Sequence, residues 1–256
     1  MPRGILTRAR AWPAELVLVR HGQSIGNLAD EKAREARSPR LDLELRDADV
    51  PLSDAGREQA EAVGRYLAKL PDGEAPDVVV ASPYRRATET AERALEAWGG
   101  EVDLLIDERL RERDLGVFDG LTRYGIREEY AEEAARRDLI GKFYYVPPSG
   151  ESWCDVSLRV RSILRDLEGW EGQRLWLFTH QAVIMSFRYV LENLTEPELL
   201  DIDRSEPLPN CSMTRYHEQD GRLRLDQFAD TAAVDAAAAA PTTDEPSKTE
   251  RAGDVD

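Results

Sequence analysis

Hydrophobic residues gather in short continuous runs, which alternate with longer segments where apolar residues recur every three or four positions. Uninterrupted apolar runs are typical of strands that are buried on both faces, as in parallel sheets. Strands that alternate with helical segments predict an α/β fold with a mostly parallel central sheet. The predicted strands are Leu16–Val19, Asp77–Ala81, Val102–Ile106 and Leu175–Thr179, followed by a closing hairpin of Asn210–His217 and Arg222–Phe228.

Helices are predicted between these strands. Ser53 is a suitable N-cap for a helix over Asp54–Leu70. Ser82-Pro83 has the residues of a second helix start, a serine N-cap followed by a proline at the first helical position. Further helices are predicted at Tyr124–Leu139, at Asp155–Leu167 and from His180 to Asn193.

Three segments depart from this pattern. Residues 1–14 are predicted to form a flexible arm, and residues 28–50 form a charge-rich insertion of the kind that often carries a binding loop or cap. From Ala229 the chain changes to Ala, Thr, Pro and acidic residues, so 229–256 is predicted to be a disordered acidic tail. The folded domain is therefore expected to span residues 15–228.

The charge balance narrows the classes of partner. The chain of 256 residues has 34 basic and 50 acidic residues, a net charge of −16, which argues against nucleic acid or an anionic membrane surface. Cys154 and Cys211 do not make a disulfide framework, and no apolar run approaches a membrane span, so a cytoplasmic location is expected. Three histidines leave little scope for a histidine-based metal site. The oligomeric state is left open.

Phosphate-suited side chains follow three of the predicted strand-to-helix crossings. The first strand ends in Arg20-His21-Gly22, and the strand Leu175–Thr179 ends in His180. Arg86 stands with Arg85 in the first turn of a helix, where cations are unfavourable because the helix N-terminus is itself positive, so a bound anion is expected to relieve them. Since the strand ends of a parallel sheet converge on one edge, these groups are expected to meet there.

Other residues are candidates by position. Asn27 follows His21 closely enough to face the same cleft, and Lys142 opens an aromatic loop that lines a substrate pocket or covers the sheet edge. Arg46 is either a second anion contact or a solvated surface residue. Glu112 lies between Arg111 and Arg113, which would lower the pKa of its carboxyl and keep it ionised unless burial or a nearby phosphate raises that pKa. His217 is assigned a structural role in the closing hairpin.

In this order, the motifs resemble the histidine phosphatase superfamily, which includes cofactor-dependent phosphoglycerate mutase and fructose-2,6-bisphosphatase. Arg20-His21-Gly22 with Asn27 is similar to the family's opening motif, and Ser82-Pro83-Tyr84-Arg85-Arg86-Ala87 to its second. Leu110-Arg111-Glu112-Arg113 with Gly116 resembles the acid loop, and Thr179-His180 the late histidine. The resemblance spans about Glu15 to Phe228 and implies a three-layer α/β/α sandwich of the phosphoglycerate mutase type.

The resemblance implies a mechanism without metal or cofactor, acting on a small phosphorylated substrate. His21 would attack phosphorus and form a phosphohistidine, while Arg20, Arg86 and His180, protonated or donating, would surround the phosphoryl oxygens. Glu112 would protonate the leaving oxygen and then activate water. The residues expected to contact substrate are Asn27, Gly22, Gln181, Arg46 and Lys142.

Two further questions concern the branch of the superfamily that the chain resembles and whether the phosphoryl group is transferred to water or back to substrate. Gln181 stands where glycine is usual, and His180-Gln181-Ala182-Val183 resembles the bisphosphatase branch. The arginine that holds the sugar 6-phosphate in that branch corresponds to Met185, which argues against fructose 2,6-bisphosphate as substrate. Hydrolysis of a phosphomonoester is the favoured interpretation; transfer of the mutase type and a phosphate-binding pseudoenzyme are the alternatives.

Overall fold

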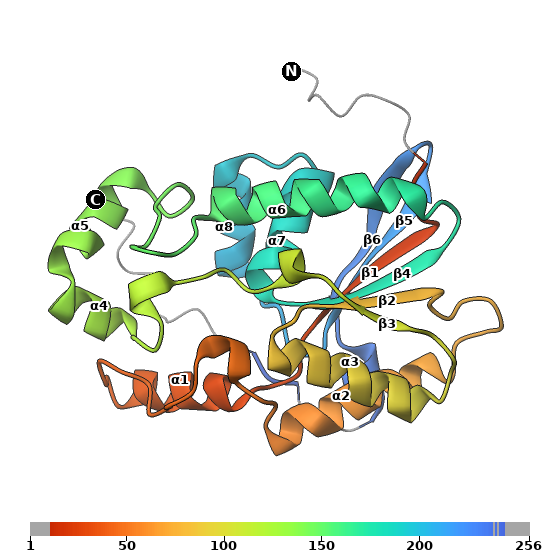
Figure 1. Cartoon of the computed structure of the whole chain (residues 1–256), viewed down its shortest axis with the longest axis horizontal. Coiled ribbons are helices and arrows are strands. Elements are labelled where there is room, and N and C mark those ends of the chain that lie inside the picture. Colours follow the sequence, from red (N-terminus) through yellow and green to blue (C-terminus); the bar gives the residue numbers. More distant parts are fainter. Residues whose placement is uncertain (1–10, 238, 240, 244–256) are drawn as a thin grey trace.

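A computed structural model describes residues 11–237, 239 and 241–243 of the chain. It has a six-stranded mixed sheet in the order β3-β2-β4-β1-β5-β6, with helices on both faces (Figure 1). This arrangement confirms the predicted α/β sandwich. The strands are β1 (Glu15–Arg20), β2 (Val78–Ala81), β3 (Leu104–Ile106), β4 (Arg174–Thr179), β5 (Met213–Gln219) and β6 (Arg222–Asp230).

The pairing of the strands explains the hydrophobic pattern. Strands β3, β2, β4 and β1 pair in parallel, and β5 and β6 extend the sheet in antiparallel pairing from β1. The central strands β1 and β4 are buried on both faces because helices cover them above and below. In register, Arg20 of β1 lies opposite Thr179 of β4, so His21 and His180 leave neighbouring strands at the same level.

Two helical layers sandwich the sheet (Figure 1). On one face, α6 and α7 pack against Leu16, Leu18 and Leu177, and on the other, α2, α3 and α9 pack against Val17, Val19 and the remaining inward side chains of the sheet. The helices are α1 (Ile25–Glu35), α2 (Asp54–Leu67), α3 (Arg85–Trp98), α4 (Arg123–Glu129), α5 (Ala131–Ile140), α6 (Trp153–Asp166), α7 (Gln181–Leu191), α8 (Glu196–Ser205) and α9 (Ala232–Ala236).

Two helix predictions need correction. The predicted helix 124–139 is divided into α4 and α5, because Tyr130 leaves the helical region with φ −132° and ψ 47° and its ring packs on buried Phe118. The helix predicted from Ser82-Pro83 begins only at Arg85, with Tyr84 at the N-cap. The Ser82 hydroxyl instead contacts His180. By contrast, Ser53 caps α2 by accepting a hydrogen bond from the Gly56 amide, as predicted.

The predictions for the two ends of the chain are also revised. Residues 1–10 lie outside the described residues, but Trp12 of the predicted arm is buried and its indole donates a hydrogen bond to the Gly221 carbonyl. Part of the predicted disordered tail is ordered: β6 runs to Asp230, and α9 buries Ala233 and Val234 against α2. The tail has a short apolar face that composition alone conceals. Residues 238, 240 and 244–256 lie outside the description.

The insertion 28–50 is more regular than its sequence suggested. Helix α1 takes up residues 25–35, with Ser24 and Asn27 forming a capping box at its start. An exposed stretch then leads to a 3₁₀ turn at Asp47–Asp49, which packs against the start of α3. The insertion therefore lies beside the carboxyl ends of the parallel strands, where Figure 1 shows α1 next to α2 and α3.

Candidate active site

The ends of β1, β2 and β4 bring the three predicted crossings together. The rings of His21 and His180 lie with centroids 5.1 Å apart, and both side chains are buried. Gly22 is required by close approach: a Cβ there would lie 2.6 Å from the Gly56 carbonyl oxygen. The Gly22 amide donates to Thr90 Oγ1, and Thr90 Oγ1 donates to the Arg86 carbonyl, which connects the first crossing to α3.

His21 is held as a neutral imidazole with one ring nitrogen fixed. Burial lowers its pKa well below the usual value, and the neighbouring Arg86 and Arg20 lower it further. Its Nδ1 atom lies 2.8 Å from the Gly22 carbonyl oxygen. Because a carbonyl only accepts, Nδ1 carries the proton, and the lone pair is on Nε2. His21 therefore presents an unprotonated Nε2 at neutral pH.

His180 is also held as a neutral imidazole, which, of the two expected states, favours donation from a neutral ring over a protonated ring. Its pKa lies well below the usual value because of burial, followed by the charge of Arg86 and the proximity of His21 and Arg20. Its Nε2 atom lies 2.8 Å from Ser82 Oγ. Its Nδ1 atom is buried and has no hydrogen-bond partner within the described part of the chain. If Nε2 accepts from the Ser82 hydroxyl, Nδ1 carries the proton and can donate to an anion.

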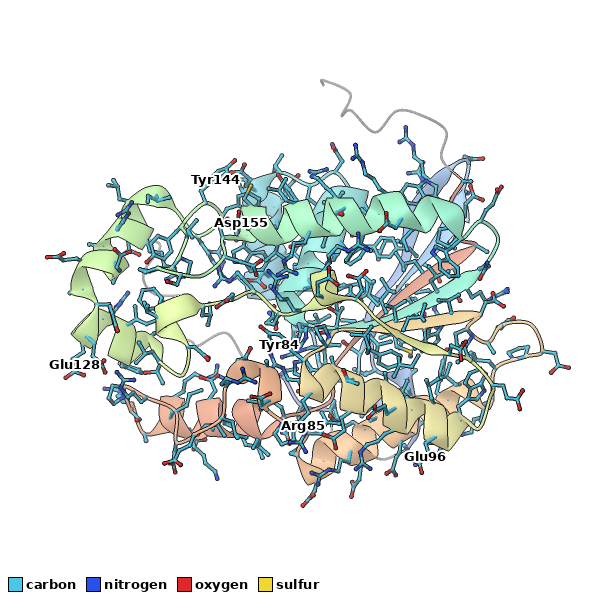
Figure 2. All side chains as sticks on the ribbon, in the orientation of Figure 1. Tyr84, Arg85, Glu96, Glu128, Tyr144 and Asp155 are labelled. Carbon is cyan, nitrogen blue, oxygen red and sulfur yellow. The ribbon has the colours of Figure 1, made fainter. Side chains whose placement is uncertain are left out.

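The two predicted arginines are both buried, at 2 % exposure for Arg20 and 5 % for Arg86. The Arg20 guanidinium donates to the Leu208 carbonyl, which anchors the side chain. Arg86 lies beside Tyr84, with its guanidinium carbon 5.3 Å from the ring centroid. Tyr84 also meets His180 edge to face at 5.3 Å, and Figure 2 shows it between the two helical layers. Tyr84 is a site residue that its motif contained and that the prediction overlooked.

The acid loop places Glu112 beside these groups. Burial raises the pKa of its carboxyl above the usual value, against the lowering effect of the Arg113 amide, which donates to Oε1, and of the charge of Arg86. Of the two outcomes left open for this pKa, the effect of burial outweighs that of the flanking arginines. Arg111 turns away to pair with Glu151 at 2.7 Å, so the desolvation of the carboxylate dominates.

Arg159 of α6 and Glu151 hold the acid loop in place, and sequence reasoning missed both. Arg159 Nη1 donates to the carbonyls of Arg109 and Arg111 at 2.6 and 3.0 Å, and the guanidinium also pairs with Glu151. Glu151 in turn accepts from the Asp114 amide at 3.1 Å. The local sequence around Glu151 and Arg159 does not mark either residue as a partner of the acid loop.

The chain matches the family model of the histidine phosphatase superfamily (branch 1) over residues 16–231. It belongs to this superfamily. It is 30% identical over 217 residues to a 2,3-bisphosphoglycerate-dependent phosphoglycerate mutase of Gloeobacter violaceus, covering 81% of this chain and 88% of that protein. A mutase of Sinorhizobium fredii is 32% identical over 201 residues, covering 76% and 87%. The structure of a mycobacterial glucosyl-3-phosphoglycerate phosphatase superposes with a TM-score of 0.65 at 28% identity, covering 85% and 100%.

The remaining predicted residues of this superfamily member occupy different places. Asn27 uses its side chain in the capping box of α1, where Oδ1 accepts from the Ser24 amide at 2.8 Å. The Arg46 side chain is 82% exposed and pairs with Asp49 at 2.6 Å. Gln181 and Lys142 converge on Asp203: Gln181 Nε2 donates to Oδ1 at 3.1 Å and Lys142 Nζ to Oδ2 at 3.0 Å.

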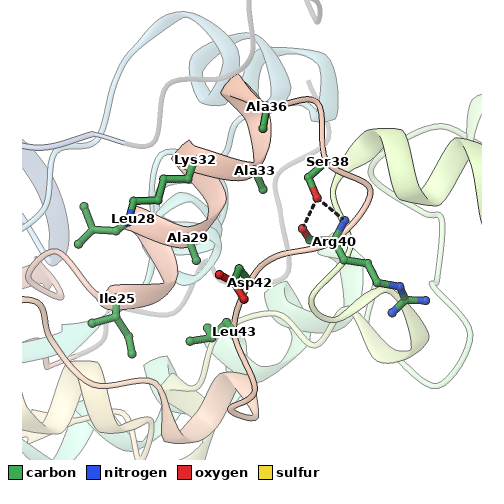
Figure 3. A pocket seen from close by; sticks show the side chains of 10 residues that line it. All are labelled: Ile25, Leu28, Ala29, Lys32, Ala33, Ala36, Ser38, Arg40, Asp42 and Leu43. Atoms are coloured by element: carbon green, nitrogen blue, oxygen red, sulfur yellow. Dashed lines mark hydrogen bonds between the residues drawn. The ribbon is translucent and has the colours of Figure 1, made fainter.

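A hollow lies outside this cluster, between α1 and the stretch that follows it (Figure 3). Its volume is about 460 Å³, and Leu28, Ala29 and Leu43 supply apolar walls, with Lys32 and Asp42 at its edge. Among the described residues, no group of His, Cys, Asp and Glu side chains is arranged to hold a metal ion. No helix within the described ranges has the length and apolar character needed to cross a membrane.

Proposed function

We propose that the protein is a phosphatase that hydrolyses a phosphomonoester of a small metabolite through a phosphohistidine on His21. The observation that carries this proposal is the state of His21, a buried neutral imidazole with Nδ1–H directed to a carbonyl and Nε2 available for attack. The adjacent Arg20 and Arg86 supply positive charge for phosphoryl oxygens. The two mutases and the phosphatase described above are all similar to this chain.

In the first step, the Nε2 lone pair of His21 forms a bond to phosphorus as the ester P–O bond breaks, and Glu112 gives its proton to the leaving oxygen. In the second step, the Glu112 carboxylate takes a proton from water, the hydroxide oxygen bonds to phosphorus, and the P–N bond breaks. Phosphate is released, and the free His21 imidazole and protonated Glu112 are regenerated. The raised pKa of Glu112 suits it to the first step, because more of it carries a proton near neutral pH.

Side chains beside Glu112 indicate the chemistry of the leaving group. Arg113 and Lys142 both lie over the ring of Trp153, with their charged atoms 5.8 and 5.7 Å from its centroid. Two cations near one aromatic ring favour a leaving group that carries an anionic group, such as a carboxylate. A screen of phosphorylated metabolites at micromolar enzyme, with matched substrates that have or lack a carboxylate, tests this preference.

Phosphoryl transfer of the mutase type is the second candidate, favoured by the two mutases that are 30% and 32% identical to this chain. The likeness of His180-Gln181-Ala182-Val183 to the bisphosphatase branch supports hydrolysis, as does the phosphatase structure at 28% identity. Met185 is buried against Phe143 and Trp153, which disfavours a second phosphate at that position. Interconversion of 2- and 3-phosphoglycerate at a rate above hydrolysis would favour the mutase.

The deciding experiment is rapid-quench trapping of acid-labile phosphate on the protein during turnover of p-nitrophenyl phosphate. Wild type is expected to show steady turnover and a phosphoenzyme, and His21→Ala neither. His217→Ala is the matched control, because His217 is exposed on β5. A phosphoenzyme in His21→Ala would place the nucleophile elsewhere, and no turnover in wild type would favour the phosphate-binding pseudoenzyme. Activity that survives excess EDTA would support the proposed independence of metal, and rescue by one metal ion would contradict it.

A further inference from the structure

Arg86 is paired with a carboxylate from the insertion. Its Nη1 donates to both the carbonyl oxygen and Oδ1 of Asp47 at 2.7 and 2.9 Å, and its Nη2 donates to Oδ2 at 3.1 Å. Both carboxylate oxygens therefore lie along the edge formed by the two terminal nitrogens. This is the edge that a guanidinium offers to a phosphoryl group in a forked pair.

Asp47 places a negative charge beside the two arginines at the start of α3. Arg85 and Arg86 stand at the start of α3, where positive charge is unfavourable, and an anion was expected to relieve them. The 3₁₀ turn Asp47–Asp49 supplies that anion from within the chain, since Asp47 pairs with Arg86 and Asp49 lies close enough to Arg85 to be influenced by its charge.

The two partners of this pair differ in their freedom to move. The Arg86 side chain is 6% exposed and packs beside Tyr84, whereas the Asp47 side chain is 40% exposed. The chain that leads to Asp47 is mostly exposed from Ala36 to Arg46. The hollow in Figure 3 lies between this stretch and α1. The Leu41 amide donates to the Gly120 carbonyl and the Thr122 amide to the Pro39 carbonyl, so the freedom to move lies in the mostly exposed residues 42–46 that follow. Asp47 is thus the displaceable member.

We propose that the Asp47 carboxylate is an internal anion that a phosphoryl group must displace from Arg86, and that its return promotes the release of product phosphate. This inference rests on the proposed function, in which Arg86 binds the transferring phosphoryl group. The exchange is favourable for substrate because a dianionic phosphate gains Arg20 and His180 as well as Arg86. It lowers the net affinity for every anion that uses this edge of Arg86.

Calorimetric titration with inorganic phosphate tests the proposal, using wild type, Asp47→Asn and Asp49→Asn. Asp49→Asn is the matched control, because it removes a carboxylate from the same turn that pairs with exposed Arg46. Asp47→Asn is expected to lower the dissociation constant for phosphate about two- to fivefold, the range for removing a partly exposed charged competitor. It should lower the inhibition constant of phosphate in turnover by the same factor, and Asp49→Asn should change neither.

Two results would overturn the inference while the proposed function stands. One is phosphate binding that is unchanged or weaker in Asp47→Asn than in wild type, when both proteins melt at similar temperatures. The other is a crystal structure with bound orthovanadate in which the Asp47 carboxylate still holds both terminal nitrogens of Arg86. Wild type that binds no phosphate and turns over no substrate would overturn the proposed function and this inference together.

Discussion

Helix α9, which packs against α2, gives a quantitative test of the fold. Val234 of α9 is fully buried, in contact with the cluster that α2, α3 and the sheet form. Val234→Ala removes two methyl groups from this cluster. At about 0.8 kcal/mol for each buried carbon, plus a term for the cavity, the free energy of unfolding should fall by about 2 kcal/mol. For a domain of this size that corresponds to a thermal midpoint lower by about 4–8 °C.

The control for this experiment is the same substitution at an exposed valine. Val146 is 50% exposed, so Val146→Ala should change the free energy of unfolding by less than about 0.5 kcal/mol. Urea unfolding followed by tryptophan fluorescence measures both variants and wild type at equal protein concentration. Equal stability of the two variants would refute the docking of α9 and would restore the prediction of a disordered tail from residue 229.

Three further outcomes follow from the site. Glu112→Gln should lower the phosphorylation rate on the order of 10²–10⁴ with alkyl phosphates but much less with p-nitrophenyl phosphate; equal losses in single turnover would contradict its role as acid. Arg159→Met should lower kcat about tenfold to a hundredfold by loosening the acid loop, whereas Arg165→Met, exposed on the same helix, should not; equal effects would contradict this. Because the folded pKa values of His21 and His180 lie below those of the unfolded chain, the unfolded chain binds more protons as pH falls. Stability should therefore decline from pH 7.5 to about 5.5, and a constant urea midpoint would contradict it.

The parts of the site that lie on regular structure could be predicted from the sequence. His21 and His180 follow apolar runs that fold as the neighbouring parallel strands β1 and β4, and the convergence of strand ends placed them together before any coordinates. Arg86 was found by a conflict between its charge and the helix N-terminus. In these cases the local pattern and the final position share one physical cause.

The errors arose where a distant residue decides the role of a local one. Ser82 had the sequence of an N-cap, but the return of β4 places His180 within hydrogen-bond distance of it. Arg111 adjoins Glu112 in sequence, yet Glu151 draws its guanidinium away. Arg46 was left open as an anion contact or a solvated residue, and its neighbour Asp47 is the residue of the insertion that reaches Arg86. Adjacency in sequence does not show which partner a long charged side chain selects.

The net charge of −16 and an anionic substrate are compatible because the positive charge of the site is buried. Exposed carboxylates act through water and salt, which screen charges beyond a Debye length of about 8 Å. Arg20 and Arg86 act at short range in a poorly screened interior, where each is held by a backbone carbonyl. The same surroundings keep both histidines neutral, so the positive charge and the nucleophile coexist at neutral pH. A carboxylate from the insertion then becomes the natural counterion of Arg86, because an unpaired buried guanidinium would destabilise the start of α3.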